Sequence, residues 1–403
     1  MHNKRFSIVR RCPSLKILGI TAEYDPFHNG HLFHMSEAIR QVNPDMTFVV
    51  LSPCFKQRGE LSLLSPSDRA LCALSAGADA VFLLPVCWTV RDAEHYALGA
   101  VSLLASLGAT HLAFGAETAE IDVLRRAAEL LESPDVSFNA SLKNNLSAGA
   151  GYPAALSAAL SDAIPEASGI LDQPNNTLAV CYLRAVLKLK VSLQPVAIPR
   201  AGSYHAASVD HAFPSASSVR DALMRGNYTA AYHAVPSYTA DLLRHRFLDG
   251  KVPDDGAFST ILLRCLRAMA AEDCGRLPDI SEGLENALKK TAAAAQSRRE
   301  LIASLAGKRY PASRISRLCT CALLGITRED LASLPLPDSA LLLGLRKRPD
   351  MTSYWKTLPI PVFSSFSSWK KTACPADLAA WSIWAQCCCL PDTLPFTEKM
   401  IVL

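Results

Sequence analysis

Short apolar runs alternate with longer, partly polar segments through the first half of the chain. Apolar runs at residues 16–22, 46–51, 80–84, 111–114 and 194–198 are typical of buried parallel strands. The segments between these runs have helical composition, and we expect helices at 29–40, 65–76, 93–107, 121–132 and 175–189. Strands that alternate with helices predict a parallel sheet with helices on both of its faces, which is the arrangement of an α/β domain.

The strand pattern stops at about residue 218, and helical patterns dominate the rest of the chain. We expect helices at 219–225, 237–246, 260–272, 280–295 and 298–305. The sequence therefore predicts three parts: an N-terminal extension at 1–16, an α/β domain at 17–235 and a mostly α-helical domain at 236–403.

One stretch without charged residues, 98–116, is long enough to raise the question of a membrane span. It contains Gly99, Gly108, Gly115 and several hydroxyl residues, which suit a buried helix, turn and strand better than a hydrocarbon-spanning helix. The first 16 residues are basic but lack the unbroken apolar segment of a secretory signal. We therefore expect no membrane association.

Composition narrows the class of protein further. Half of the 403 residues are hydrophobic, which is enough for a large core and excludes wholesale disorder. The 13 cysteines include no CxxC pair. Disulfide-stabilised domains are usually short and have an even number of cysteines, and this chain has neither property, so we interpret the cysteines as reduced thiols of a cytoplasmic protein. The net charge of +4 argues against a chain that acts as a whole as a polycation.

The charge is unevenly distributed. Residues 289–317 contain eight basic side chains and a single acidic one, Glu300, so this segment has a net charge of +7. Two interpretations stay open: the basic residues cover solvated helix faces, or they form a surface for an anionic polymer.

The strongest chemical signal is His28-Asn29-Gly30-His31, which follows the first expected strand and lies at the start of the first expected helix. A helix N-terminus offers free backbone N–H groups and a partial positive charge to a phosphate. Two histidines three residues apart share one helix face, and Gly30 leaves room for close approach of a nucleotide. Such a site can stabilise charge on an α-phosphate when pyrophosphate leaves. The simpler alternative is two surface histidines at a helix start.

These residues resemble the signature of the HIGH-type nucleotidylyltransferase superfamily, which includes the class I aminoacyl-tRNA synthetases. The longer stretch EYDPFHNGHLFH at 23–34 is similar to that of the tRNA(Met) cytidine acetate ligases. Further segments that resemble this family follow in order: QRGE at 57–60, FGAE at 114–117, GYPAA at 151–155, PNN at 174–176, SASSVR at 215–220, and KRY at 308–310 with Arg314 beyond.

The resemblance implies a Rossmann-like HIGH nucleotidylyltransferase domain with a parallel sheet, followed by a mostly α-helical, tRNA-binding domain. It implies that acetate attacks the α-phosphate of ATP, which gives acetyl-adenylate and pyrophosphate. The wobble cytidine of elongator tRNA(Met) would then attack the acetyl carbonyl through its N4 amine, which gives N4-acetylcytidine and AMP. ATP is expected to arrive with Mg²⁺, although no carboxylate cluster in the sequence marks a protein metal site.

The resemblance also implies which residues bind the substrates. His28 and His31 would be catalytic. The residues expected at ATP are Thr21, Ala22, Glu23, Tyr24, Asp25, Pro26, Phe27, His28, Asn29, Gly30, His31, Leu32, Phe33, His34, Gly115, Asn175, Asn176, Arg200, Ser217 and Arg220. Those expected at the RNA are Arg58, Lys308, Arg309 and Arg314.

The serine-rich turn at 215–220 is expected to hold the β- and γ-phosphates, with Ser217 or Ser218 as helix N-cap. Arg58 and Arg69 are further candidates for contacts to phosphate or RNA. Ordinary solvated arginines, and an ordinary capped helix at 215–220, are the simpler alternatives.

Three departures from the family pattern leave the substrate open. Asp25 stands where the family usually has Asn, and its carboxylate would repel phosphate unless it is paired or turned away. Ser52-Pro53-Cys54 replaces a Ser-Gly-His type of sequence, and there is no KMSKS-like loop. Two alternatives therefore stay open: an adenylyltransferase or ligase that acts on a small molecule, and a non-catalytic tRNA-binding protein.

Overall fold

A computed structural model describes residues 15–200, 214–307, 309–349 and 351–403. Its centre is one sheet of eight strands in the order β5-β4-β1-β2-β3-β6-β7, with β8 paired to β6. The five strands predicted from the sequence are present and mutually parallel: β1 (Ile17–Ala22), β2 (Met46–Leu51), β3 (Ala80–Leu83), β4 (His111–Ala116) and β5 (Gln194–Pro199). The prediction of an α/β fold with a parallel sheet is therefore confirmed.

The expectation that no strand follows residue 218 is wrong. β6 (Ala340–Leu345) pairs antiparallel with β3, and β7 (Val362–Phe363) and β8 (Ile401–Val402) both pair with β6. The sequence of β6 is ALLLGL, an apolar run without alternation, and such a run does not distinguish a buried strand from a piece of buried helix. The C-terminal part of the chain thus returns to the sheet of the N-terminal part.

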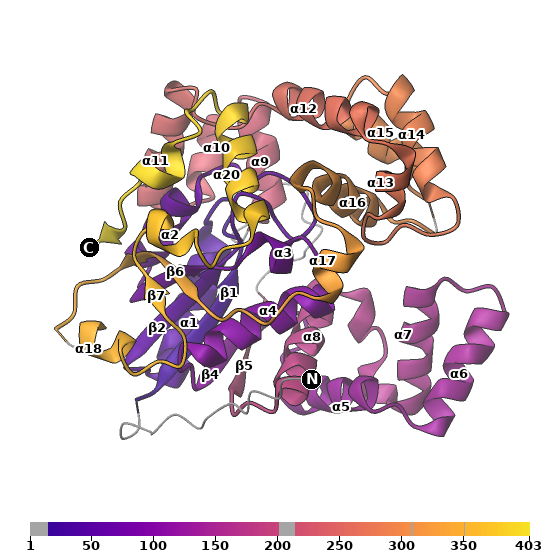
Figure 1. Ribbon diagram of the computed structural model, residues 1–403. Helices are drawn as coiled ribbons and strands as arrows, with labels where there is room; N and C mark the ends of the chain where they lie inside the picture. Colours follow the sequence, from indigo (N-terminus) through magenta and orange to yellow (C-terminus); the bar gives the residue numbers. More distant parts are fainter. Residues whose placement is uncertain (1–14, 201–213, 308, 350) are drawn as a thin grey trace.

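The helices of the first half cover both faces of the sheet (Figure 1). Ser65 begins one of them as predicted, since its Oγ accepts a hydrogen bond from the backbone N–H of Asp68 at 3.0 Å. The expected helices are α1 (Asn29–Val42), α2 (Pro66–Ser75), α4 (Ala93–Ser106), α5 (Ile121–Glu132) and α8 (Pro174–Leu189). Three α-helices were not expected: α3 (Val86–Thr89), α6 (Val136–Ser147) and α7 (Tyr152–Ala163).

Helices dominate after residue 214, as predicted. Of the expected segments, 260–272 is interrupted because the chain is extended at Met269, and 280–295 begins only after Gly283. The helices are α9 (Ala216–Met224), α10 (Tyr228–His233), α11 (Ser237–Leu248), α12 (Asp255–Ala268), α13 (Ala271–Gly275), α14 (Leu284–Ala294), α15 (Arg298–Leu305), α16 (Ala312–Leu324), α17 (Arg328–Ala332), α18 (Met351–Trp355), α19 (Phe366–Trp369), α20 (Pro375–Cys387) and α21 (Leu394–Thr397).

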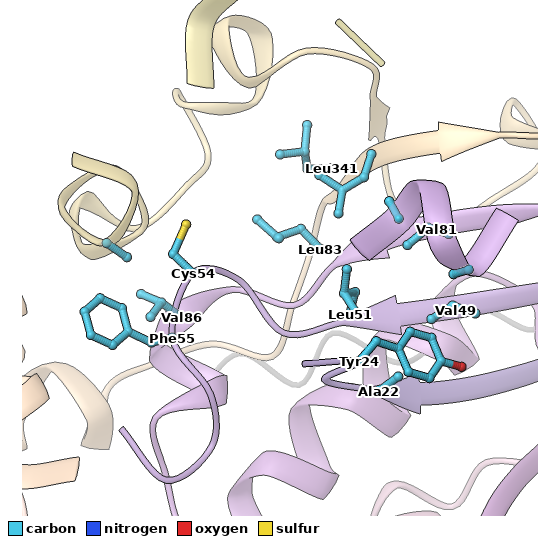
Figure 2. Packing of buried hydrophobic residues seen from close by; sticks show 14 of the residues in the cluster. Ala22, Tyr24, Val49, Leu51, Cys54, Phe55, Val81, Leu83, Val86 and Leu341 are labelled. Atoms are coloured by element: carbon cyan, nitrogen blue, oxygen red, sulfur yellow. The ribbon is translucent and has the colours of Figure 1, made fainter. Parts of the chain in front are cut away.

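The core divides according to the two faces of the sheet. Alternate residues of β2 point to opposite sides, so Val49 and Leu51 belong to one cluster and Phe48 and Val50 to the other. The first cluster (Figure 2) also contains Leu341 of β6 and tryptophans of α19 and α20, so the C-terminal segment packs into the core of the sheet. The boundary at residue 236 stays a prediction, but the residues after it do not all form a separate body.

The middle of the helical part has a core of its own. Leucines of α12, α14, α15 and α16 pack together in a cluster distinct from those on the sheet. Figure 1 shows these helices grouped on one side of the molecule, away from α6 and α7. Within the part of the chain that the structure describes, no helix is both long enough and apolar enough to cross a membrane.

Candidate active site

A cavity of about 910 Å³ lies at the carboxyl ends of β1, β4 and β5. This edge is where open α/β sheets bind their ligands. The N-termini of α1, α8 and α9 also border the cavity, and α16 of the helical part contributes Ser313 and Arg317. Its size and position suit a nucleotide together with a second reactant.

Most of the residues predicted at ATP line this cavity. They are Thr21, Ala22, Glu23, Tyr24, His28, Gly30, His31, Phe33, His34, Gly115, Asn175, Arg200, Ser217 and Arg220. Of the residues predicted at RNA, Arg58 lines it as well. The residues that lie outside the lining are Asp25, Pro26, Phe27, Asn29, Leu32, Asn176, Arg309 and Arg314. Lys308 falls outside the described residues.

The two histidines of the HxGH motif hold each other at the start of α1. His28 is the N-cap, and its Nδ1 accepts hydrogen bonds from the backbone N–H groups of Gly30 at 3.0 Å and His31 at 3.3 Å. In return, Nδ1 of His31 accepts from the backbone N–H of His28 at 3.3 Å. The two rings stack with their centroids 3.6 Å apart. Because both Nδ1 atoms act as acceptors, each neutral imidazole carries its proton on Nε2, which is left as a hydrogen-bond donor.

Burial keeps these imidazoles neutral. It lowers the pKa of His28 to about 3, and the positive charges of Arg200 and Arg220 add to the effect. Burial also lowers the pKa of His31, with His28, His34 and Arg200 contributing. The histidines can therefore donate hydrogen bonds, whereas the positive charge of the cavity comes from the arginines and the helix N-termini.

Gly30 has a local reason to lack a side chain. A Cβ at this position would lie 2.9 Å from Cε1 of His28, so the stacked ring occupies the space that a side chain would need. Gly30 was predicted at this site from its small size, and the stacked ring of His28 adds a reason that only the structure shows.

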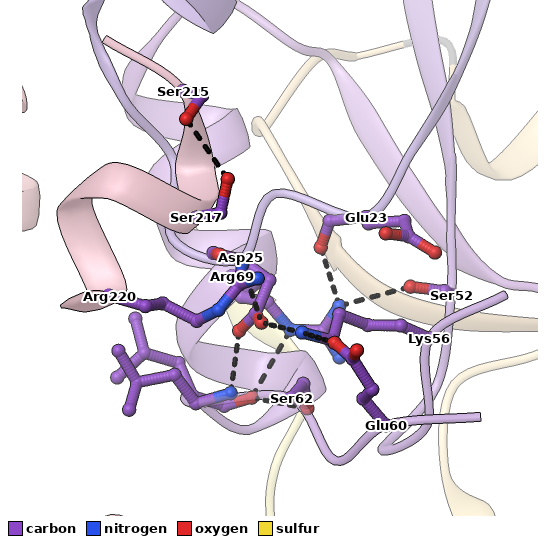
Figure 3. A network of polar contacts seen from close by, with 12 residues as sticks. Glu23, Asp25, Ser52, Lys56, Glu60, Ser62, Arg69, Ser215, Ser217 and Arg220 are labelled. Atoms are coloured by element: carbon purple, nitrogen blue, oxygen red, sulfur yellow. Dashed lines mark hydrogen bonds and ion pairs between the residues drawn. The ribbon is translucent and has the colours of Figure 1, made fainter. Parts of the chain in front are cut away.

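Asp25 is buried behind the cavity and fully paired (Figure 3). Its Oδ2 lies 2.9 Å from Nζ of Lys56 and 3.4 Å from Nη1 of Arg220, and its Oδ1 accepts from the backbone N–H of Leu63. Burial alone would raise its pKa, but Lys56, Arg220 and Arg69 outweigh burial, so the pKa of Asp25 lies below its usual value. The carboxylate that could have repelled phosphate is therefore neutralised within the protein.

Arg69 is not a phosphate contact. Its side chain is completely buried and donates to the backbone carbonyls of Glu23 at 2.6 Å and Leu64 at 3.2 Å, and also to that of Pro53. It therefore ties the loop after β1 to the loop after β2. Burial of a planar guanidinium among carbonyl oxygens gives no local sequence signal.

The helix after the serine-rich turn has its N-cap earlier in the chain than predicted. Ser215, rather than Ser217 or Ser218, is the N-cap of α9, because Ser215 and Ser218 form a reciprocal capping box. Ser217 lines the cavity with its Oγ 3.0 Å from Oγ of Ser215, while Nη1 of Arg220 donates to the backbone carbonyl of Asp25 at 2.6 Å.

The structure also separates Asn175 from Asn176. Asn176 is buried, and its Oδ1 accepts from the backbone N–H of Thr118 at 2.9 Å, so it fixes the loop after β4. Asn175 lines the cavity, and its Nδ2 donates to Glu117. Asn175 is therefore the better candidate for a ligand contact.

A loop of the α/β part docks on the helical part and brings α16 to the cavity. The carbonyl oxygen of Gly59 accepts hydrogen bonds from Arg298 at 3.0 Å, Ser316 at 3.1 Å and Thr320 at 2.8 Å. Gly59 has φ of 72°, and a Cβ there would lie 2.8 Å from the carbonyl oxygen of Ser316. This junction places Arg317 in the lining, a contribution that the sequence argument missed.

Several basic residues of the segment 289–317 have structural partners. Nζ of Lys289 donates to the backbone carbonyls of residues 266, 267 and 269, and so holds the C-terminus of α12. Arg309 forms an ion pair with Glu282, and Arg314 donates to the carbonyl of Asp279 at 2.8 Å while its guanidinium lies over Tyr310. The basic segment is thus partly a set of helix-stabilising contacts.

Fold and cavity together define a HIGH-type nucleotidylyltransferase. The family model described as HIGH Nucleotidyl Transferase matches residues 15–390. Among curated proteins, the tRNA(Met) cytidine acetate ligase of Acetivibrio thermocellus is 33% identical, with 96% of this chain and 100% of the relative covered. The tRNA(Met) cytidine acetate ligase of Fervidobacterium nodosum is 31% identical, with 88% of this chain and 85% of the relative covered. The chain belongs to the tRNA(Met) cytidine acetate ligase family.

Solved structures agree with this assignment. The apo crystal structure of Thermotoga maritima TmcAL superposes with a TM-score of 0.90 at 26% identity, and covers 96% of this chain and 100% of its own. The same protein bound with alpha-thio ATP superposes with a TM-score of 0.89 at the same identity. The chain is therefore a ligase of this family.

Proposed function

We propose that the protein activates acetate with ATP and transfers the acetyl group to N4 of the wobble cytidine of elongator tRNA(Met). The observation that carries the proposal is the pair of stacked, neutral histidines at the start of α1, with Nε2 donors beside a cavity that also contains Arg200 and Arg220. A cytoplasmic location, where tRNA and ATP are available, is part of this proposal.

In the first step, a carboxylate oxygen of acetate attacks the α-phosphate and pyrophosphate leaves. Negative charge increases on the α-phosphate oxygens and on the bridging oxygen as the bond breaks. In our proposal, Nε2–H of His28 and of His31 donate to these oxygens, and Ser217, Arg200 and Arg220 hold the β- and γ-phosphates. Mg²⁺ would arrive with ATP and offset charge on its phosphates; among the described residues, no group of three His, Cys, Asp or Glu side chains is placed to bind a metal ion.

In the second step, the N4 amine of the cytidine attacks the acetyl carbonyl and AMP leaves. The base must enter the cavity from outside, and we propose that it does so past Arg58 and the α16 residues Ser313 and Arg317. Arg309 and Arg314 lie outside the cavity, where they could contact the RNA backbone next to that base.

Acetate-dependent exchange of labelled pyrophosphate into ATP tests the first step. Purified protein should catalyse this exchange with acetate, and AMP should accumulate only when tRNA(Met) is added. Exchange with another carboxylate and no response to tRNA would favour a small-molecule ligase. No exchange with any carboxylate, together with tight tRNA binding, would favour the non-catalytic alternative.

Charge reversal at Arg309 tests the RNA surface. Arg309→Glu should weaken tRNA(Met) binding about tenfold and reduce the slope of log affinity against log salt by about 1 if one phosphate contact is lost. The matched control is Arg125→Glu on α5, because Arg125 is also exposed and paired to a carboxylate, Asp122, at 3.0 Å. Equal affinities for the two variants in a filter-binding titration would exclude Arg309 from the RNA surface.

A further inference from the structure

Two cysteine thiols face each other where α3 meets α20, outside the lining of the nucleotide cavity. The Sγ atoms of Cys87 and Cys374 lie 3.1 Å apart, although the two residues are 287 positions apart in the chain. Cys87 is buried in α3, and Cys374 is partly exposed immediately before α20. Because a disulfide bond is about 2.05 Å long, a small movement of the side chains would bring the sulfurs to bonding distance.

The surroundings give the two thiols different reactivity. The thiol of Cys87 donates to the sulfur of Cys374, and this contact lowers the pKa of Cys374, with the backbone N–H of Ala376 adding to the effect. Cys374 is also the N-cap of a 13-residue helix, whose free N–H groups favour a thiolate. Elsewhere in the protein, burial raises the pKa of cysteines such as Cys72 and Cys319.

The contact between the two helices is held by a third residue. Oδ1 of Asp377, in the first turn of α20, accepts from the backbone N–H of Val86 at 2.7 Å. Burial raises the pKa of Asp377 to about 8, and the negative charge of Cys374 contributes to this, so near neutral pH the carboxyl is mostly protonated. Asp377 therefore fixes the first turns of α3 and α20 side by side.

We propose that Cys87 and Cys374 form a reversible disulfide on exposure to low-molecular-weight disulfides such as oxidised glutathione. The partly exposed Cys374 thiolate attacks one glutathione sulfur, forms a mixed disulfide and releases a glutathione thiolate. The thiol of Cys87 then loses its proton to that thiolate and attacks Sγ of Cys374, which releases the second glutathione. Two cysteine thiols are oxidised and one disulfide is reduced to two thiols.

The bond would connect two segments that are far apart in the chain but pack in the same core cluster, to which Cys87 and α20 both belong. Asp92 and Ala93, shortly after α3, line the cavity, and α20 packs in the core cluster that contains β2 and β6. Cys87 thus lies five positions before Asp92 of the cavity wall, and formation of the bond does not depend on the function proposed above.

Peptide mass spectrometry of the full-length protein tests this site. The reduced protein is incubated with oxidised glutathione under native conditions, quenched with acid, alkylated and digested without reduction. We expect a cross-linked peptide that contains Cys87 and Cys374 and that dithiothreitol removes. In Cys87→Ser, glutathione should stay on Cys374, because no thiol can displace it. In Cys374→Ser, the buried Cys87 should stay reduced.

The control is Cys389→Ser, which removes an exposed cysteine and should leave the cross-link unchanged. Circular dichroism melting shows whether each variant folds, and Cys87→Ala replaces Cys87→Ser if the buried hydroxyl prevents folding. The proposal is overturned if glutathione remains on Cys374 of the wild type while Cys87 stays reduced, or if Cys389 is modified and Cys374 is not.

Discussion

His28→Asn should slow acetate-dependent ATP–pyrophosphate exchange about 10²–10³-fold while the thermal unfolding midpoint stays close to that of the wild type. Asparagine is among the best N-cap residues, and its Oδ1 can accept from the N–H groups of Gly30 and His31 as Nδ1 of His28 does. The substitution keeps the helix cap and removes the Nε2 donor that we assign to the phosphate. Exchange rate and melting midpoint, measured on the same preparation, separate the two roles of His28.

His31 allows the complementary substitution. His31→Gln keeps an N–H donor near the position of Nε2, whereas His31→Ala keeps none, so the glutamine variant should retain more exchange activity. His245→Ala is the control, because His245 is exposed on α11 and is not among the residues that line the cavity. Wild-type exchange by a folded His28→Asn variant, or equal rates for His31→Gln and His31→Ala, would contradict the donor role.

The pH profile provides a second readout for the same two residues. Burial, followed by Arg200 and Arg220, lowers the pKa of His28 to about 3, so the neutral ring with its Nε2–H is present throughout the neutral range. The kcat/KM of exchange should therefore show no histidine titration between about pH 5 and 8. A decrease as pH rises through about 6.5 would mean that the reaction needs an imidazolium.

The features that the sequence predicted are those that depend on local pattern. The five parallel strands follow from apolar runs, and the HxGH site follows from residue type and its place between a strand and a helix. The cap at Ser215 was displaced because serines at 215, 217 and 218 can each begin a helix, and only the reciprocal bonds of Ser215 and Ser218 decide among them.

The features that the sequence did not predict depend on contacts between distant segments. β6 pairs with β3 although it lies more than 250 positions later in the chain. Its uniform apolar run shows no hydrophobic periodicity that would identify a strand. The docking of Gly59 on α15 and α16 also lacks any local signal, because its donors are Arg298, Ser316 and Thr320. The contribution of Arg317 to the cavity follows from that docking and was missed with it.

The pairing of Asp25 is the clearest case of a departure that the structure explains. The resemblance identified Asp25 as an unusual carboxylate, and the structure supplies Lys56, 31 positions later, as its buried partner. Both side chains are almost inaccessible, at 1% and 6% of their surfaces, and Nζ of Lys56 also lies 2.8 Å from Glu60. The negative charge of Asp25 is thus part of a charge network behind the lining of the cavity rather than part of that lining.

Lys56→Met should destabilise the protein by about 3–5 kcal/mol near neutral pH, because it leaves the carboxylate of Asp25 buried without its closest partner. The double variant Asp25→Asn/Lys56→Met should recover most of this loss, since it removes both charges and Oδ1 of the asparagine can still accept from Leu63. Urea unfolding followed by circular dichroism measures the unfolding midpoints of the wild type, Lys56→Met and the double variant. Lys251→Met is the control, because Lys251 pairs with Asp249 in an exposed contact.

The stability lost in Lys56→Met should also depend on pH in a defined direction. In the wild type the pKa of Asp25 lies below its usual value, so its stabilising contribution is present above the ordinary carboxyl pKa of about 4 and is lost as pH falls through the lower, folded value. In Lys56→Met the same carboxyl has lost its main cation, so its pKa rises and it becomes neutral at a higher pH. The difference in stability between the wild type and Lys56→Met should therefore narrow on acidification. A difference that stays constant with pH, or a double variant as unstable as Lys56→Met, would mean that lost packing of the lysine chain, and not the unpaired charge, determines the effect.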